Sequence, residues 1–252
     1  MITNLHFDYC SLILLIFVIA ALLLRSLNRG RTNKLFYTLT ITLFIANITD
    51  IVSIIFEEFG NFTSSTLWAR WLVEYIYFFS RNLTGILYFL YVSSLLGVWH
   101  KIFQSIKSKL LVYLPISVLF AALFLNVFNK KIFFYDINLS YTRGPWIYIL
   151  YLVNLYYVLS SIVILFRNRE NIKFYKFVAL LFFLPIEILA AALELYFPTQ
   201  RLDILATTII VIIVAVGVQR PEDFLDYSIG VNSYNSFLND MTRYAVAYTP
   251  IH

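Results

Sequence analysis

Five ionisable side chains lie inside long apolar stretches of this 252-residue sequence, where a charge is costly. They are Asp50, Glu74, Arg81, Glu187 and Glu194. Glu74 and Arg81 are seven residues apart, and the two glutamates of the later stretch repeat this spacing, so each pair shares one face of a helix. Asn47 lies three residues before Asp50 and shares its face. The pattern predicts polar groups that turn toward one another inside a helical bundle.

Depth within the apolar stretches suggests which of these groups meet. Arg81 and Glu187 lie about ten residues from the same end of the bundle, and Asp50 about six. A charge near the middle of a bilayer costs on the order of 3 kcal/mol, and pairing lowers that cost. We therefore expect an ion network of Arg81, Glu187 and Asp50, roofed by Glu74 and Glu194. It is either a polar ligand or proton site that faces outward, or a structural contact that fixes the helix register.

Motifs for catalysis are missing from the sequence. The three histidines are scattered at positions 6, 100 and 252, so no zinc-binding His pair exists. There is no Gly-rich phosphate loop and no G-x-S-x-G elbow. Cys10 is the one cysteine, which excludes an intramolecular disulfide and a Cys-ligated metal cluster. We expect a protein that is not an enzyme and that has no cofactor and no metal site.

The elements that position these residues are seven apolar stretches, near residues 9–24, 35–56, 71–98, 110–127, 146–166, 177–195 and 204–218. About 20 helical residues cross the hydrocarbon core of a bilayer. With 61% hydrophobic and 13% charged residues, a soluble protein would lack polar surface. The sequence predicts an all-α membrane bundle of seven transmembrane helices, with the lipid bilayer as its main partner.

Charge predicts the orientation of these helices. Most of the 19 Lys and Arg residues fall in the connections 25–34, 100–109 and 167–176 and in the segment after residue 218. Short loops rich in Lys and Arg stay in the cytoplasm. The N-terminus should therefore lie outside and the C-terminus inside. The net charge of +5 mostly reflects the basic residues of the predicted cytoplasmic loops. We expect no nucleic-acid partner.

One segment carries a family resemblance. Arg143, Gly144 and Pro145 end an external loop and lead into an aromatic stretch that begins with Trp146 and contains Tyr148, Tyr151, Tyr156 and Tyr157. This arrangement resembles the N-terminal seven-transmembrane region of bacterial histidine kinases. In that family the membrane region is the sensory input of a cytoplasmic kinase or diguanylate cyclase. The resemblance implies a multi-pass sensor of the bacterial cytoplasmic membrane.

The segment after residue 218 resembles the beginning of a diguanylate cyclase (GGDEF) domain. Asp226, Gly230 and Phe237 match the typical D-x-L-T-G-L-x-N-R-x-x-F pattern, whereas Ser233 and Tyr234 stand where Asn and Arg are expected. No cyclase activity can be carried over, because the Gly-Gly-acidic signature is missing. We divide the chain into a sensory domain, residues 1–218, and a cytoplasmic tail, residues 219–252.

The tail is predicted to contain an amphipathic helix after Gly230, because apolar residues recur there at helical spacing. A lone helix of about 15 residues is marginal in water. Residues 221–248 are therefore expected to contact a second copy of the chain, the membrane surface or a cytoplasmic effector. The alternative is a remnant of a lost domain that frays.

The sequence favours a sensory module that binds an unknown small ligand from outside or from the membrane and relays a helix shift to the cytoplasm. The alternative is a small transporter or channel that uses the interior Arg, Glu and Asp side chains. Transporters typically show internal repeats and discontinuous helices. We find no repeat between the two halves, and Pro185 is a single break in the stretch 177–195.

Overall fold

The computed structural model describes residues 5–24, 30–59, 64–135, 141–196, 202–219, 225–226, 231–232 and 241. Its helices are α1 (His6–Leu24), α2 (Arg31–Phe59), α3 (Ser64–Leu95), α4 (Trp99–Gln104), α5 (Ile106–Asn129), α6 (Ile147–Arg167), the 3-10 turn η2 (Arg169–Asn171), α7 (Phe174–Leu181), α8 (Phe183–Tyr196) and α9 (Asp203–Gly217). Two short strands, β1 (Phe133–Tyr135) and β2 (Tyr141–Arg143), form a hairpin between α5 and α6. The prediction of an all-α bundle is confirmed for the described residues.

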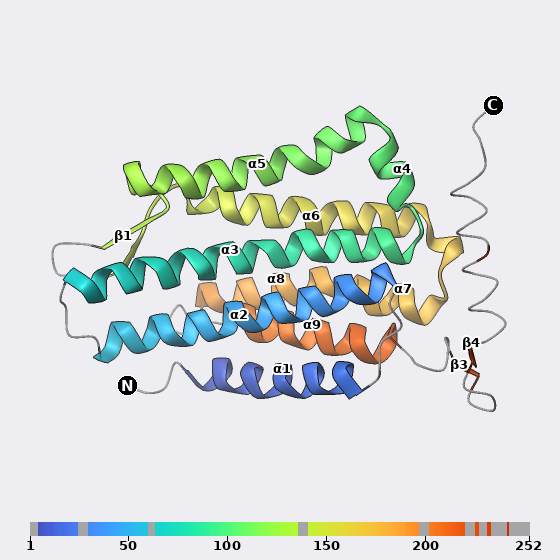
Figure 1. Ribbon diagram of the computed structural model, residues 1–252, viewed down its shortest axis with the longest axis horizontal. Helices are drawn as coiled ribbons and strands as arrows, with labels where there is room; N and C mark the ends of the chain where they lie inside the picture. Colours follow the sequence, from blue (N-terminus) through green and yellow to red (C-terminus); the bar gives the residue numbers. More distant parts are fainter. Residues whose placement is uncertain are drawn as a thin grey trace.

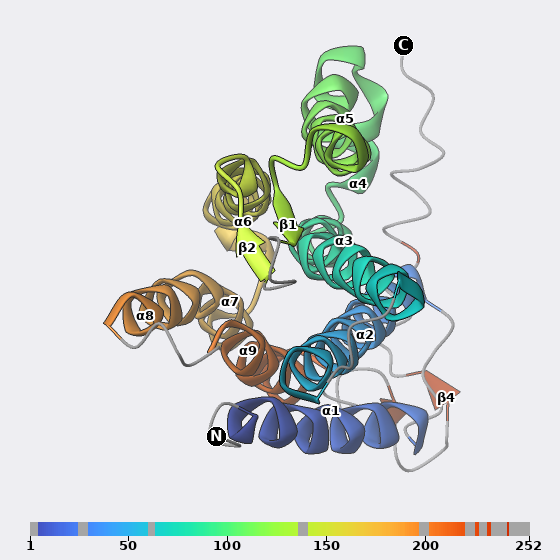
Figure 2. The ribbon, with the colours of Figure 1, turned by 90° about the vertical axis from the view of Figure 1, so that its left-hand side faces the viewer.

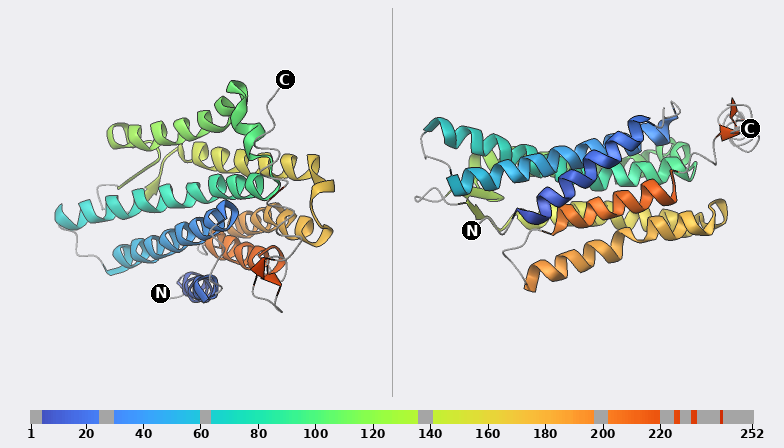
Figure 3. Two further views of the ribbon diagram at one scale, coloured as in Figure 1. Left: turned by 45° about the vertical axis from the view of Figure 1, so that its right-hand side comes forward. Right: turned by 90° about the horizontal axis from the view of Figure 1, so that it is seen from below.

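The long helices run back and forth along one axis (Figure 1). Helices α1, α3, α6 and α9 run in one direction, and α2, α5 and α7 followed by α8 return in the other. Helix α1 is inclined to the rest: the left panel of Figure 3 views it end-on while the other long helices are seen from the side. The connections between helices therefore gather at two opposite ends of the bundle.

Helix α3 is central to the packing. It lies against α2 and α6, while α9 packs against α1, α2, α7 and α8 (Figure 2). Two large clusters of buried apolar side chains form most of the described core. One joins α1, α2, α3, α6, α7, α8 and α9, and the other joins α3, α5, α6 and β1. Tyr91 and Tyr157, both fully buried, are among the largest side chains in them.

Large apolar side chains also cover the outside of the bundle. Phe17 and Leu24 on α1, Phe124 and Phe128 on α5, and Leu152 on α6 are all more than 60% exposed. A water-soluble protein rarely exposes apolar patches this extensive, whereas a bilayer solvates them favourably. An apolar exterior of this kind is typical of a membrane protein.

Four described helices are long and apolar enough to cross a membrane: α1, α2 over Arg31–Glu57, α5 and α6. This indicates a membrane protein. Helix α3 is 32 residues long but carries Arg70, Glu74 and Arg81, and α9 is apolar but only 15 residues long. The stretch 177–195, expected as one span, is divided at Phe182 into α7 and α8.

Pro185 gives a local cause for that division. A proline within a helix lacks the N–H that would bond four residues back, and its ring crowds that carbonyl. Tyr88 on α3 stabilises the same region, because its hydroxyl donates a 2.6 Å hydrogen bond to the carbonyl of Leu180 and its ring packs on Phe183 with centroids 4.1 Å apart. The helical stretch 177–195 is thus discontinuous and is held against α3 at the break.

The hairpin is tied to α5 by one amide side chain. Asn126 accepts a 2.7 Å hydrogen bond from the backbone N–H of Ile132 and donates to the carbonyl of Phe133 at 3.3 Å. Lys130 turns the chain with a left-handed φ of 52°. Gly144 closes the hairpin, since an added Cβ would stand 2.1 Å from the carbonyl oxygen of Lys131. The hairpin lies across one end of the bundle (Figure 2).

The tail departs from its prediction where it is described. Val231 and Asn232, expected at the start of an amphipathic helix, pair antiparallel with Leu225 and Asp226 as β4 (Val231–Asn232) and β3 (Leu225–Asp226). Met241 is helical. The other residues of the predicted partner-binding segment, 221–248, lie outside the described residues.

Candidate functional site

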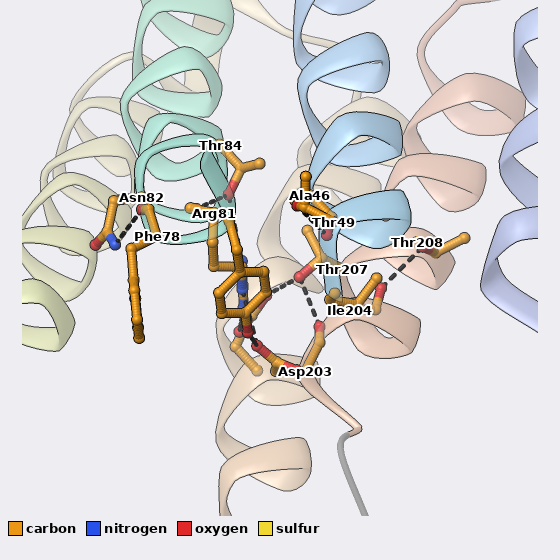
Figure 4. Close-up of polar contacts among 12 residues, drawn as sticks. Ala46, Thr49, Phe78, Arg81, Asn82, Thr84, Asp203, Ile204, Thr207 and Thr208 are labelled. Carbon is orange, nitrogen blue, oxygen red and sulfur yellow. Dashed lines mark hydrogen bonds and ion pairs between the residues drawn. The ribbon is translucent and has the colours of Figure 1, made fainter. Parts of the chain in front are cut away.

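Arg81 forms the charged centre of the bundle. Its Nη2 lies 3.2 Å from Oε2 of Glu187, and its Nε lies 3.0 Å from Oδ2 of Asp203. Its Nη1 donates a 3.2 Å hydrogen bond to Thr84 Oγ1. Figure 4 shows Arg81 on α3 reaching the start of α9. The guanidinium thereby joins three helices, α3, α8 and α9.

Local structure fixes both carboxylates. Asp203 is the first residue of α9, where the positive end of the helix dipole favours an acid. Glu187 lies two residues after Pro185 in α8. Thr207, one turn into α9, donates a 2.6 Å hydrogen bond to Oε1 of Glu187 and also contacts the backbone carbonyl of Asp203 at 2.8 Å. Helices α8 and α9 are therefore linked with or without the arginine.

The three charged side chains are partly open. The exposed fractions are 11% for Arg81, 19% for Glu187 and 26% for Asp203. Two carboxylates surround one guanidinium, so the group carries one net negative charge when all three are ionised. Charge-assisted hydrogen bonds of this kind are roughly twice as strong as neutral ones. An added cation, or a ligand with a cationic group, can compete with Arg81 for the carboxylates.

This geometry contains one expected partner of Arg81 and one that was not expected. Arg81 and Glu187, assigned to one network from their depth, form an ion pair. The printed ion pairs of Arg81 within the described part of the chain are with Glu187 and Asp203, and the expected contact of Arg81 with Asp50 stays a prediction. Sequence reasoning missed Asp203 because it stands just before the apolar stretch 204–218. The signal was an acid at a helix start with a threonine four residues later.

The residues expected to roof the network are Glu74 and Glu194, and this role stays a prediction. Glu74 is buried two turns from Arg81 and accepts a hydrogen bond from Ser53 on α2. The side chain of Glu194 lies outside the described residues, although its backbone belongs to α8. Asp50 is fully buried on α2, on the same face as Asn47, whose amide contacts Ser11 of α1.

A second polar group lies beneath the hairpin. The guanidinium of Arg70, itself buried, stands 4.6 Å from the centre of the Tyr135 ring. Burial raises the pKa of Tyr135 above its ordinary value, and the nearby carboxylate of Glu74 raises it further, while Arg70 partly offsets these effects. Trp71 packs on the same ring, with centroids 5.7 Å apart. The arrangement anchors β1 to α3.

Within the described ranges, no group of three or more His, Cys, Asp or Glu side chains converges as a metal centre would require. An apolar groove of about 430 Å³ lies between α3 and α5, lined by Tyr75, Ile76, Phe79, Phe120, Leu123, Phe124 and Val127. Its lining suits a hydrocarbon chain and offers little to a charged ligand.

Comparison with known proteins does not identify the chain. No protein-family model, no curated protein and no solved structure matches it. The resemblances of residues 133–165 and 220–237 therefore stay predictions.

Proposed function

We propose that this chain is the sensory module of a multi-pass membrane protein in the bacterial cytoplasmic membrane. In this proposal seven helical passes cross the bilayer with the N-terminus outside and the C-terminus inside. The Arg81–Glu187–Asp203 network receives the signal in the outer half. The observation that carries the proposal is that one arginine binds α9, the helix that leads to the C-terminal segment.

The alternation of helix directions supports seven passes and this orientation. The connections at the end of the bundle where α9 ends contain Lys101, Lys107, Arg169, Lys173 and neighbouring basic residues. The start of α1 and the β1–β2 hairpin lie at the opposite end (Figure 1). Because Lys and Arg concentrate in cytoplasmic loops, the first end is proposed to face the cytoplasm.

Side-chain contacts join α9 to α3 near both ends of α9, which supports a relay of motion between these two helices. Near the start of α9, Asp203 binds Arg81; at its other end, Gln219 lies 3.3 Å from the hydroxyl of the buried Tyr91. Arg81 and Tyr91 are separated by about 15 Å along α3, at 1.5 Å per residue. A ligand that binds the carboxylates better in one arrangement than in another shifts α9 relative to α3. In this proposal the movement of α9 passes directly to the segment that follows residue 218.

Topology is testable with cysteine labelling in intact cells. In a Cys10→Ser background, a cysteine at Lys130 should react with a membrane-impermeant maleimide. A cysteine at Ser105 should react only after the cells are permeabilised. Both positions are exposed in the fold, so access depends on the side of the membrane. The reverse pattern would contradict the proposed orientation.

A transporter is the second candidate, and the break between α7 and α8 is the observation that favours it. Transporters bind ions at discontinuous helices, and the Glu187 carboxylate follows this break. Proteoliposomes that enclose a pH-sensitive dye separate the two functions. The sensory proposal predicts no proton flux above that of empty vesicles under an imposed pH gradient. Flux that disappears in Arg81→Gln would establish transport.

A further inference from the structure

The apolar groove between α3 and α5 is separate from the Arg81 network. Its lining comes from one turn of α3, residues 75–79, and two turns of α5, residues 120–127. Helix α3 begins at the end of the bundle where α5 ends (Figure 1). The lining residues farthest from that end, Phe79 and Phe120, meet with ring centroids 5.6 Å apart. This contact closes the groove toward the middle of the bundle, so the groove opens toward the end of α5.

The wall of the groove is apolar and faces the surroundings of the bundle. Phe120, Phe124 and Val127 are 51%, 66% and 55% exposed. The volume of about 430 Å³ is typical of a site that holds one small organic ligand. Tyr75 is the lining residue with a polar side-chain atom, and its hydroxyl accepts a 3.2 Å hydrogen bond from Nδ2 of Asn126. A hydrocarbon chain matches this wall.

Two side chains at the open end of the groove suit the headgroup of a lipid. Lys130, which is exposed, follows Val127 by three residues, or about 4.5 Å along the helix axis. On α3, Trp68, Leu72 and Ile76 recur every four residues and share one face, and Trp68 is 79% exposed. Tryptophan is favoured at the boundary between hydrocarbon and headgroups, and a long lysine side chain reaches that boundary.

Neighbouring charged side chains have partners away from the groove. Glu74 is buried and accepts a hydrogen bond from Ser53 on α2. The Nζ of Lys131 stands 4.9 Å from the centre of the Trp146 ring, next to the start of α6. The guanidinium of Arg70 lies beneath the hairpin. The charge beside the open end of the groove is therefore positive, and it complements an anionic headgroup.

We propose that this groove binds one acyl chain of an anionic phospholipid, with the phosphate of the lipid at Lys130. The chain lies along Phe124 and Val127 and ends at the contact between Phe79 and Phe120. The apolar wall alone would accept any hydrocarbon chain, and the lysine adds a preference for negative charge. The site is independent of which end of the bundle faces the cytoplasm.

A lipid in this position contacts the support of the β1–β2 hairpin. Tyr75 stacks on Trp71 with centroids 5.9 Å apart and meets the ring of Phe133 in β1 at 5.2 Å. Asn126, bonded to the Tyr75 hydroxyl, also accepts the N–H of Ile132. The bound chain packs beside these side chains, so lipid binding is expected to slow amide exchange in the hairpin.

Native mass spectrometry of the full chain in detergent tests the headgroup preference. Delipidated protein is titrated with phosphatidylglycerol and with phosphatidylcholine that carries the same acyl chains. One phosphatidylglycerol per chain should be retained, with an apparent affinity about fivefold above that of phosphatidylcholine. Lys130→Gln should abolish this preference. The matched control Lys107→Gln, an exposed lysine at the other end of α5, should retain it.

A variant that fills the groove tests the place of the acyl chain. Val127→Phe adds a ring to the wall and should lower the retention of both lipids at least fivefold. Val163→Phe on α6 is the matched control, because Val163 is also 55% exposed and lies outside the groove lining. This control should retain both lipids as the parent chain does.

Several results would overturn the proposal. Equal retention of the two lipids by the parent chain would do so irrespective of how the variants fold. An equal loss of preference in Lys130→Gln and Lys107→Gln would show a general effect of net charge. Unchanged retention in Val127→Phe would place the lipid outside the groove. A dimer that Val127→Phe dissociates would assign the groove to a second copy of the chain.

Discussion

Replacing Arg81 with methionine removes the cation between two carboxylates while keeping a long side chain on α3. Removing one partner of a buried ion pair costs about 3–5 kcal/mol. Glu187 and Asp203 are 19% and 26% exposed, so water reaches them and lowers the cost. We expect Arg81→Met to lose about 2–3 kcal/mol of unfolding free energy, which for a chain of this size corresponds to roughly 5–10 °C in melting temperature.

A double-mutant cycle separates the pair interaction from loss of packing. Asp203→Asn removes one of the carboxylates left without their cation, so the double variant with Arg81→Met should be less destabilised than the two single losses added together. The coupling should reach about 1–3 kcal/mol. Thermal unfolding in nanodiscs, followed by tryptophan fluorescence, provides the measurement.

The control and the refuting result are both defined by the structure. Lys107 is exposed at the start of α5, and Lys107→Met should change the unfolding free energy by no more than about 0.5 kcal/mol. If the losses from Arg81→Met and Asp203→Asn simply add, the two side chains do not interact energetically. The contact between Arg81 and Asp203 would then contribute nothing measurable to the stability of the protein.

Three further variants test contacts that hold the helices in place. Gly85→Ala would bring a Cβ to 1.9 Å from Oδ1 of Asn154 on α6. We expect this variant to lose about 1–3 kcal/mol of unfolding free energy, measured by thermal unfolding. The control Gly30→Ala, whose Cβ would have nothing within 4 Å, should leave the unfolding free energy unchanged. Tyr88→Phe removes the hydroxyl bond at the break between α7 and α8 and should cost about 1 kcal/mol in the same assay. Asn126→Ala leaves the β1 backbone without its partners, so amide exchange in the hairpin should accelerate while exchange in α6 stays unchanged.

The sequence predicted the Arg81–Glu187 contact because depth in a membrane bundle is readable from residue counts. Two charges about ten residues from the same end reach the same level, and each needs a partner. Depth does not reveal which helices are neighbours. Asp50 was expected beside Arg81, but its face of α2 also carries Asn47, whose amide contacts α1. Many arrangements of the same helices satisfy one depth profile.

Helix ends and breaks were harder to predict than helix existence. Asp203 stands just outside the predicted apolar stretch 204–218, yet it begins α9, since an acid in the first turn is favoured there. Pro185 marked the sixth apolar stretch as irregular, but the division at Phe182 depends on the tertiary contact with Tyr88 as well. Val231 had helical spacing, whereas pairing with Asp226 places it in β4.

The relay through α9 is tested most directly by a distance between the inner ends of two helices. Spin labels at Arg167 on α6 and Val216 on α9, in a Cys10→Ser background, are both on exposed positions. Because α6 packs against α3, the distance between the two spin labels reports the position of α9 relative to α3. Double electron–electron resonance should give a shifted or second distance population in Arg81→Gln and an unchanged one in Lys107→Gln. Identical distributions in the parent and both variants would contradict control of α9 by the Arg81 network.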